Sequence, residues 1–223
     1  MRRICIFDWT GTIVDKQRLA PLKAFIKTLN QFGINNRSDE EIKKYMGMDP
    51  FYHLFKLLGN VEMTRNMYPY LTENLKQSFH KYSTPVPYTN DVFKYLKSRG
   101  YMIGSCSEYD REILEKAIDT SRFYGMIIPQ TSVASDEVKI SRPGGDMIKE
   151  NIKFLSILNG ITVQKDKISV IKVGDTIEDI QEGVCAKVEY NIGISSDKNT
   201  TIQMYKQGAT HVITNIEDLF RIL

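Results

Sequence analysis

The sequence has little of what marks membrane proteins, disulfide scaffolds and zinc proteins. No window approaches the ~20 consecutive apolar residues that cross a bilayer, and residues 1–7 are too short for an export signal and are typical of a strand. The only cysteines are Cys5, Cys106 and Cys185, which lack the pairwise spacing of a zinc site. We therefore expect no membrane partner and a reducing, cytoplasmic location.

Charge of one sign is also scarce. The chain has 30 Lys and Arg against 27 Asp and Glu, a formal net charge of +3. Nucleic-acid binding needs basic residues clustered on one face, so the dispersed charge predicts no nucleic-acid partner. Hydrophobic residues make up 42% of the 223 residues, which is enough for a packed core in one domain, or in a core domain with a small insertion.

Short apolar runs alternate along the chain with longer segments of helical period. This alternation is typical of α/β proteins, in which helices bury both faces of the strands. It predicts a Rossmann-like, doubly wound parallel sheet. The expected strands are residues 3–7, 101–105, 124–128, 168–173, 190–194 and 211–214, and the expected helices are residues 90–98, 109–118, 145–158, 177–186, 200–206 and 216–223.

The stretch from Asp15 to Pro87, about seventy residues, has no segment with the period-two pattern of a strand. Its periodicity predicts helices at residues 20–32, 39–46, 51–58 and 64–81, and Ser38 with Glu41 makes a capping box for the second. We therefore expect an α/β core domain of residues 1–15 and 88–223, and an α-helical domain of residues 16–87 inserted as a lid after the first strand.

Four polar clusters lie where the predicted sheet would bind a ligand, beyond the carboxyl ends of its strands. Carboxylates there can hold Mg²⁺ or attack phosphorus, and hydroxyl, guanidinium and amide groups can bind phosphoryl oxygens. The clusters therefore predict phosphoryl chemistry. They are Asp8-Trp9-Thr10-Gly11-Thr12, Ser105-Cys106-Ser107, Ser141-Arg142-Pro143, and Gly174-Asp175 with Glu178-Asp179.

In this order the four clusters resemble the motifs of the haloacid dehalogenase (HAD) superfamily of hydrolases, and the helical insertion resembles the cap of its members. The resemblance implies that Asp8 is both the nucleophile and a metal ligand. It implies that Ser107 and Arg142 bind the phosphate. It also implies that Asp175 and the backbone carbonyl of Thr10 hold Mg²⁺, with Asp179 either as a direct ligand or as an acidic partner of the ligands.

Within that superfamily the pattern is most similar to the phosphonoacetaldehyde hydrolases. That family forms a Schiff base between a cap lysine and its substrate, but Pro50 stands here at the lysine position and Arg18 at that of a hinge cysteine. Lys43, Lys44 and Lys56 are the remaining candidate amines nearby. The shared features are Trp9, the segment Leu19-Ala20-Pro21-Leu22, Met46-Gly47 with His53, the segment Tyr109-Asp110-Arg111-Glu112, and Arg142 in place of Lys.

Thr10 is a second departure, because HAD phosphatases usually have there an Asp that exchanges the proton of the leaving group. His53 and Tyr109 are the expected substitutes, although His53 also fits a packed position in an aromatic segment. The residues expected to bind substrate, of which Trp9, Met46 and Tyr109 fit lid packing equally well, are Trp9, Gly11, Thr12, Met46 and Tyr109.

Three functions follow from these residues. The first is a Mg²⁺-dependent phosphohydrolase that acts on a small phosphorylated or phosphonate metabolite through an aspartyl-phosphate. The second is hydrolysis of phosphonoacetaldehyde with a different lysine. The third is a phosphoryl-binding regulatory protein with weak turnover. The aromatic lid surface leaves both a monomer and a homodimer open.

Overall fold

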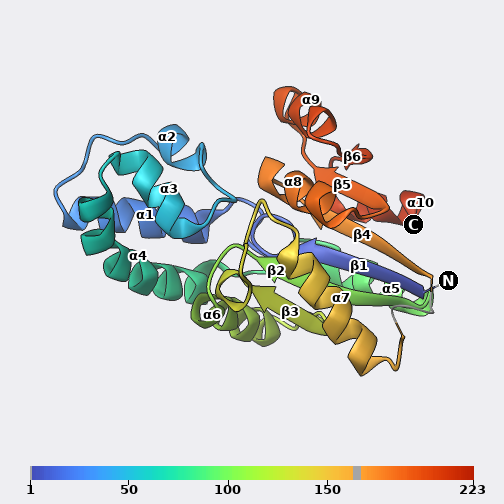
Figure 1. The fold of residues 1–223 in the computed structure, drawn as a ribbon. Helices are drawn as coiled ribbons and strands as arrows, with labels where there is room; N and C mark the ends of the chain where they lie inside the picture. Colours follow the sequence, from blue (N-terminus) through green and yellow to red (C-terminus); the bar gives the residue numbers. More distant parts are fainter. Residues whose placement is uncertain (1, 163–166) are drawn as a thin grey trace.

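A computed structural model describes residues 2–162 and 167–223, which form a parallel sheet between layers of helices, with four further helices to one side (Figure 1). The spatial order of the strands is β3-β2-β1-β4-β5-β6. The chain therefore builds outward in both directions from β1 and β4, which confirms the doubly wound α/β prediction. The strands are β1 (Arg2–Asp8), β2 (Tyr101–Ser107), β3 (Thr131–Ala134), β4 (Ile168–Gly174), β5 (Tyr190–Ile194) and β6 (His211–Ile213).

Alternate residues of β1 face opposite layers of the core. Ile4 and Ile6 pack with Met147 of α7, whereas Phe7 packs against Phe93 of α5 with the ring centroids 5.1 Å apart. This two-sided burial explains why the central strands are apolar throughout. The core helices are α5 (Thr89–Ser98), α6 (Arg111–Phe123), α7 (Asp146–Leu158), α8 (Ile177–Ala186), α9 (Lys198–Lys206) and α10 (Leu219–Ile222), with the short 3₁₀ helices η1 (Ser135–Glu137) and η2 (Ile216–Asp218).

The strand predicted at residues 124–128 is wrong, and the third strand is β3 instead. Tyr124 ends α6, Gly125 follows in a left-handed conformation (φ 74°), and the Met126 amide donates to the Ser121 carbonyl (2.9 Å). This is a glycine-terminated helix end, so the apolar residues after it pack against the core as a loop. In the same way, the predicted 39–46 helix ends at Lys43, and the predicted 216–223 helix is divided between η2 and α10.

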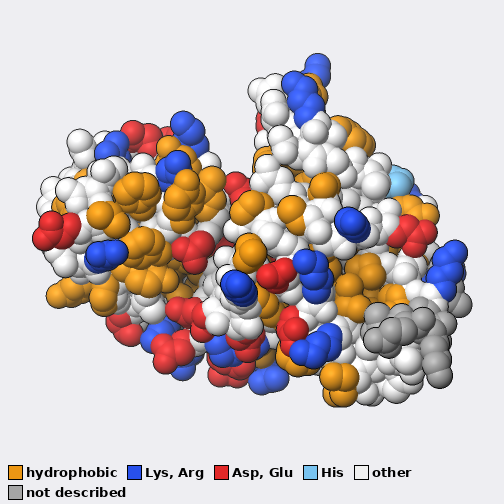
Figure 2. All heavy atoms as spheres, viewed as in Figure 1, with side chains coloured by type: hydrophobic (Ala, Val, Ile, Leu, Met, Phe, Trp, Pro, Cys, Tyr) orange, Lys and Arg blue, Asp and Glu red, His pale blue; other side chains and the backbone are white. Residues whose placement is uncertain are grey.

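The inserted segment forms α1 (Leu19–Gln31), α2 (Asp39–Lys43), α3 (Pro50–Leu58) and α4 (Val61–Tyr82), which we call the cap helices. They bury an apolar cluster of their own, which includes Phe25 and Phe79 and continues into α6 through Ile113. The capping box of α2 is present at Ser38. Figure 2 shows the surface hollowed between the cap helices and the side of the molecule that carries α9. The division into two domains at residues 16 and 87 stays a prediction.

The two connections between sheet and cap helices are paired with each other. The Asp15 amide donates to the Thr84 carbonyl (2.9 Å), and the Val86 amide donates to the Ile13 carbonyl (2.9 Å). The Asp15 carboxylate then accepts hydrogen bonds from the first two amides of α1, at 2.9 and 2.7 Å. This pairing fixes where α1 begins relative to the end of β1.

Two predictions of the sequence analysis concern location. Among the described residues, no helix is long and apolar enough to cross a bilayer. Cys5, Cys106 and Cys185 are all free thiols. A cytoplasmic location stays a prediction.

A glycine pair in the cap tests its contact with the core. A Cβ on Gly47 (φ 93°) would lie 2.8 Å from the Thr176 side chain, whereas a Cβ on Gly59 (φ 65°) would meet nothing within 4 Å. We expect Gly59→Ala to lower the free energy of unfolding by about 1–2 kcal/mol through backbone strain alone. Gly47→Ala should lower it by about 2–5 kcal/mol, because a steric overlap is added. Urea unfolding measures both, and equal losses would show that the cap loop does not contact Thr176 in solution.

Candidate active site at the carboxyl edge of the sheet

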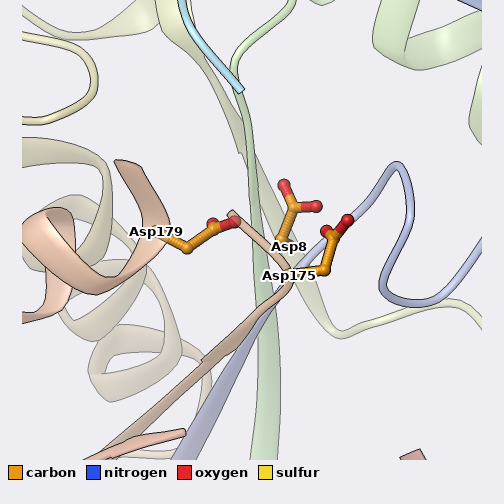
Figure 3. Close-up of side chains that lie close together, drawn as sticks. All are labelled: Asp8, Asp175 and Asp179. Atoms are coloured by element: carbon orange, nitrogen blue, oxygen red, sulfur yellow. The ribbon is translucent and has the colours of Figure 1, made fainter. Parts of the chain in front are cut away.

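The carboxyl ends of β1 and β4 bring together acidic residues that are far apart in the sequence. Asp8 ends β1 beside Cys106 of β2, and Asp175 directly follows the neighbouring strand β4. The side chains of Asp8, Asp175 and Asp179 converge (Figure 3), with one oxygen of each within 4.8 Å of the others. This is the point of a doubly wound sheet at which ligands bind.

Asp179 is oriented by the start of α8. The Asp179 amide donates to the Thr176 hydroxyl (3.2 Å) and Asp179 Oδ2 accepts from the Thr176 amide (3.1 Å), which forms a capping box. Asp179 Oδ2 also accepts a hydrogen bond from the Thr176 hydroxyl (2.6 Å). Its Oδ1 lies 3.0 Å from Lys172 Nζ and 3.1 Å from Arg142 Nη2. Burial raises the pKa of Asp179, but the charges of Arg142 and Lys172 outweigh burial and hold it well below its ordinary value.

Arg142 is the buried cation at the centre of the site. Its Nη1 lies 2.8 Å from Asp8 Oδ1 and 3.2 Å from Glu108 Oε2, and its Nε donates to Glu182 Oε2 (3.0 Å). Lys172, fully buried on β4, adds a contact of 2.8 Å to the same Glu182 oxygen. Guanidinium groups suit such sites because their fixed fork of donors can serve several acceptors at once.

Arg18 provides a second guanidinium, from the connection to the cap. Its Nε and Nη2 donate to the two oxygens of Asp175 (2.9 and 2.8 Å), and its Nη1 donates to Glu108 (3.3 Å). Its Nη2 also lies 3.7 Å from Asp8 Oδ2. Asp175 accepts a further hydrogen bond from the Thr12 hydroxyl (3.0 Å). Thr12 therefore orients an acidic side chain of the site.

The environment of Asp8 fits a bound divalent cation. The side chain is fully buried, and neither oxygen accepts a hydrogen bond of good geometry from the described residues. Burial, reinforced by the carboxylates of Asp179 and Glu108, raises its pKa well above the ordinary value, although Arg142 and Arg18 oppose the shift. A hard cation such as Mg²⁺ prefers such carboxylate oxygens.

The charges of the ion-pair network lead to the same conclusion. Among the residues that the structure describes, five carboxylates of this network contact three cationic side chains, which leaves a formal excess of two negative charges. An uncompensated charge is costly to bury, so a proton or a cation must balance the excess. One divalent cation has the required charge. The carboxylates are Asp8, Glu108, Asp175, Asp179 and Glu182, and the cations are Arg18, Arg142 and Lys172.

Three more of the predicted site residues, Ser107, Thr10 and Gly11, lie close in sequence to members of this network. Ser107 is buried one position beyond Cys106 on β2, and its hydroxyl accepts from the Tyr109 amide (3.2 Å). Thr10 is fully buried, and its hydroxyl has no hydrogen-bond partner among the described residues. Gly11 (φ 93°) donates its amide to the Val14 carbonyl (2.8 Å), and a Cβ there would overlap the Asp175 carboxylate. Only glycine leaves room for that carboxylate.

Trp9 and Tyr109, which fitted either substrate binding or lid packing, both lie in packed positions. The buried indole of Trp9 donates to the Ser105 hydroxyl (2.8 Å) within the sheet core. The ring of Tyr109 meets Phe79 of α4 edge-on with the centroids 4.7 Å apart, and thus joins core to cap. Met46 lies at the edge of the cap cluster and reaches the cleft between cap and core.

His53 lies inside the cap. Its ring stacks on Phe25 (centroids 3.9 Å apart) and meets Tyr45 at 5.8 Å. Burial lowers the pKa of His53 to about 3. The ring is therefore neutral near pH 7 and has no imidazolium proton to give to a leaving group. This is the packed position that the aromatic segment around His53 also predicted.

A cleft of about 380 Å³ leads from the surface to Arg18 and Asp175. Lys43 and Lys44 line it on the cap side, which places two of the three candidate lysines at the site entrance. Lys56 lies instead over the Tyr52 ring, 4.9 Å from its centroid. The remaining lining residues are Lys16, Gln17, Met46, Thr176, Ile177, Glu178 and Thr200.

Sequence reasoning missed four charged residues of the network. Lys172 had a clear signal, since it is the only charged residue in an otherwise apolar strand and a buried charge needs partners. Glu182 lies three residues after Asp179 and therefore on the same helix face. Glu108 directly follows Ser107 at the end of β2. Arg18 was noticed only as a departure from a resembling family.

The sequence is similar to known hydrolases that share this fold. A family model described as "Haloacid dehalogenase-like hydrolase" matches residues 5–207. A phosphonoacetaldehyde hydrolase of Bacteroides fragilis is 28% identical over 96% of this chain and 92% of its own length. One of Parabacteroides distasonis is 31% identical over 87% of this chain and 76% of its own.

The fold has close counterparts among solved structures. A phosphonoacetaldehyde hydrolase-like protein from Oleispira antarctica superposes with a TM-score of 0.86 at 24% identity, covering 99% of this chain and 91% of its own. A putative beta-phosphoglucomutase from Thermotoga maritima gives 0.69 at 16% identity, covering 100% and 98%. At these identities the likeness shows the fold.

The buried imidazole of His53 predicts a specific loss of stability in acid. Unfolded, His53 binds a proton below about pH 6.5, whereas folded it does so only near pH 3. Stability is therefore lost as the pH falls from 6.5 toward 3, by at most about 1.4 kcal/mol per pH unit. We expect His53→Phe, whose ring can still stack on Phe25, to remove this contribution. Urea unfolding between pH 7 and 4.5 measures it, and parallel curves for the variant and the wild type would contradict it.

Proposed function

The chain belongs to the haloacid dehalogenase-like hydrolases, and from that premise we propose that it hydrolyses a small phosphorylated or phosphonate metabolite with Mg²⁺, through an aspartyl-phosphate on Asp8. The supporting observation is the convergence of Asp8, Asp175 and Asp179 at one edge of the sheet, with Arg142 among them. The cleft beside them is lined by four cationic side chains, Lys16, Arg18, Lys43 and Lys44, which suits an anionic substrate.

Each residue has a chemical task in this proposal. A carboxylate oxygen of Asp8 attacks phosphorus, the bond from phosphorus to the leaving group breaks, and water then hydrolyses the aspartyl-phosphate. Arg142, 2.8 Å from Asp8 Oδ1, and the Ser107 hydroxyl bind the phosphoryl oxygens on which charge develops. The carboxylates of Asp8, Asp175 and Asp179 and the carbonyl of Thr10 would hold Mg²⁺. The ion would favour the ionised form of Asp8 and offset phosphoryl charge.

The need to protonate the leaving group limits which substrates the site can hydrolyse. Thr10 has no acidic proton near pH 7, and the pKa of His53, lowered to about 3, leaves its ring neutral. Burial raises the pKa of Tyr109 well above its ordinary value, so its phenol is a weak acid. The site therefore suits a leaving group that departs without strong general acid catalysis. Tyr109 remains the candidate proton donor.

Removing the nucleophile tests this function. We expect wild-type protein to hydrolyse p-nitrophenyl phosphate, whose leaving group needs little protonation, when Mg²⁺ is present and not after chelation. Asp8→Asn should lower kcat/KM by about 10³-fold or more. Asp91→Asn, a matched change on the exposed surface of α5, should leave the rate unchanged. Equal turnover by Asp8→Asn would contradict the mechanism. Phosphate binding by the wild type without turnover of any phosphoester would favour the regulatory protein.

A second candidate function is cleavage of a carbon–phosphorus bond. It is favoured by relatives named phosphonoacetaldehyde hydrolase and by Lys43 and Lys44 at the cleft. Pro50, buried at the start of α3, offers no amine for a Schiff base. The amine would have to come from Lys43 or Lys44, at the end of α2.

Borohydride reduction with phosphonoacetaldehyde separates the two functions. If a Schiff base forms, mass spectrometry should find the reduced adduct on Lys43 or Lys44, and the double variant Lys43→Arg, Lys44→Arg should abolish it. Lys56→Arg is the matched control, because Lys56 lies over Tyr52, outside the cleft lining. Phosphoester hydrolysis without any adduct would remove the carbon–phosphorus route.

A further inference from the structure

Arg18 puts a positive charge among the carboxylates that the proposed function assigns to a metal ion. Its guanidinium binds both oxygens of Asp175 and lies 3.7 Å from Asp8. Arg18 Nη2 and the Thr12 hydroxyl both donate to Oδ1 of Asp175, and Arg18 Nε donates to Oδ2, so each oxygen of that carboxylate has a donor. A cation that used Asp175 as a ligand would have to take an oxygen that Arg18 holds.

The backbone holds Arg18 in this place. Arg18 is left-handed (φ 53°), its amide donates to the Asp15 carbonyl (2.8 Å), and its own carbonyl accepts the Leu22 amide (3.2 Å) in the first turn of α1. Its side chain is only 10% exposed. Gly11 makes room for the pair, because a Cβ there would lie 2.8 Å from Arg18 Nε. The contact is thus built into the connection between sheet and cap.

We propose that Arg18 competes with the divalent cation for Asp175 and Asp8, so that metal binding requires the guanidinium to leave Asp175. The inference rests on the proposed function and deepens it. Two positive charges cannot share the half-buried Asp175 carboxylate without mutual repulsion, which is stronger there than in bulk water. Arg18 is therefore a positioning residue that weakens metal binding by the free-energy cost of releasing its own ion pairs.

Replacement of Arg18 by the metal ion at Asp175 would also free the Arg18 guanidinium to bind substrate. Arg18 lines the cleft together with Lys43 and Lys44. Once released from Asp175, its guanidinium can bind an anionic oxygen of a ligand in that cleft, for which its planar fork is suited. Metal and anionic substrate would then bind cooperatively, since each favours the released state of Arg18.

Manganese binding tests the competition directly. Mn²⁺ replaces Mg²⁺ in oxygen-ligand sites, and free Mn²⁺ is measured by electron paramagnetic resonance. We expect Arg18→Gln to bind Mn²⁺ about tenfold or more tightly than the wild type, and Arg18→Lys to fall between them, because lysine keeps the charge without the bidentate fork. Arg99→Gln is the matched control, since the exposed Arg99 guanidinium lies over the Tyr95 ring, 4.7 Å from its centroid, and does not line the cleft. It should bind like the wild type.

Thermal unfolding gives a second measurement of Mn²⁺ binding, which can be used if Arg18→Gln folds poorly. Mn²⁺ should raise the Tm of Arg18→Lys more than that of the wild type, because a ligand stabilises the fold in proportion to its affinity. Adding inorganic phosphate should tighten Mn²⁺ binding to the wild type, and should do so much less for Arg18→Gln.

The outcomes separate this inference from the proposed function. Equal Mn²⁺ affinity in wild type, Arg18→Gln and Arg18→Lys would overturn the competition while leaving the metal-dependent hydrolase intact. Weaker binding by Arg18→Gln would also overturn it. Absence of Mn²⁺ binding in every variant, including after addition of phosphate, would overturn the competition together with the proposed metal dependence. Tight binding by Arg18→Gln that persists in a double variant with Asp175→Asn would place the ion elsewhere and reject the inference.

Discussion

The structure depends on the balance of charge around Asp8, a fully buried side chain in a network where carboxylates outnumber cations. Arg142 and Lys172 satisfy Asp179 and Glu182 on one side, and Arg18 satisfies Asp175 on the other. Asp8 lies between these two groups, with a pKa raised by burial and by neighbouring carboxylates. Such an arrangement costs stability in itself, and a poorly solvated carboxylate is what the proposed role of Asp8 as nucleophile and metal ligand would use.

The fold supplies this balance from separate parts of the chain. Parallel strands place Asp8, Ser107 and Asp175 at one edge because their carboxyl ends coincide, and a capping box turns Asp179 toward them. The cap contributes through its first connection, where left-handed Asp15 and Arg18 redirect the chain. The site is therefore complete only when sheet and cap connection are both in place.

Much of this could be predicted from sequence, because it depends on local rules. Apolar strands followed by polar clusters locate the edge of the sheet, and Gly11 indicates a close backbone approach. The third strand was misplaced because Met126 is apolar without being paired, whereas β3 is short and half polar. Which charged side chains pair with each other is not decided by local sequence. That Arg18 reaches Asp175, 157 positions away, depends on tertiary packing, which no sequence period encodes.

The helix α6 belongs to two apolar clusters at once, since Ile113 and Ala117 pack with the cap and Leu114 and Ile118 pack with the sheet. A lid attached only by its two connections could swing away as a rigid unit. The cap helices share α6 with the sheet, so they would instead have to pivot about α6. The edge of the cap away from α6 would open, and the edge packed on α6 would stay closed. Such a motion would widen the cleft that reaches Arg18 and Asp175 without detaching the cap helices from α6.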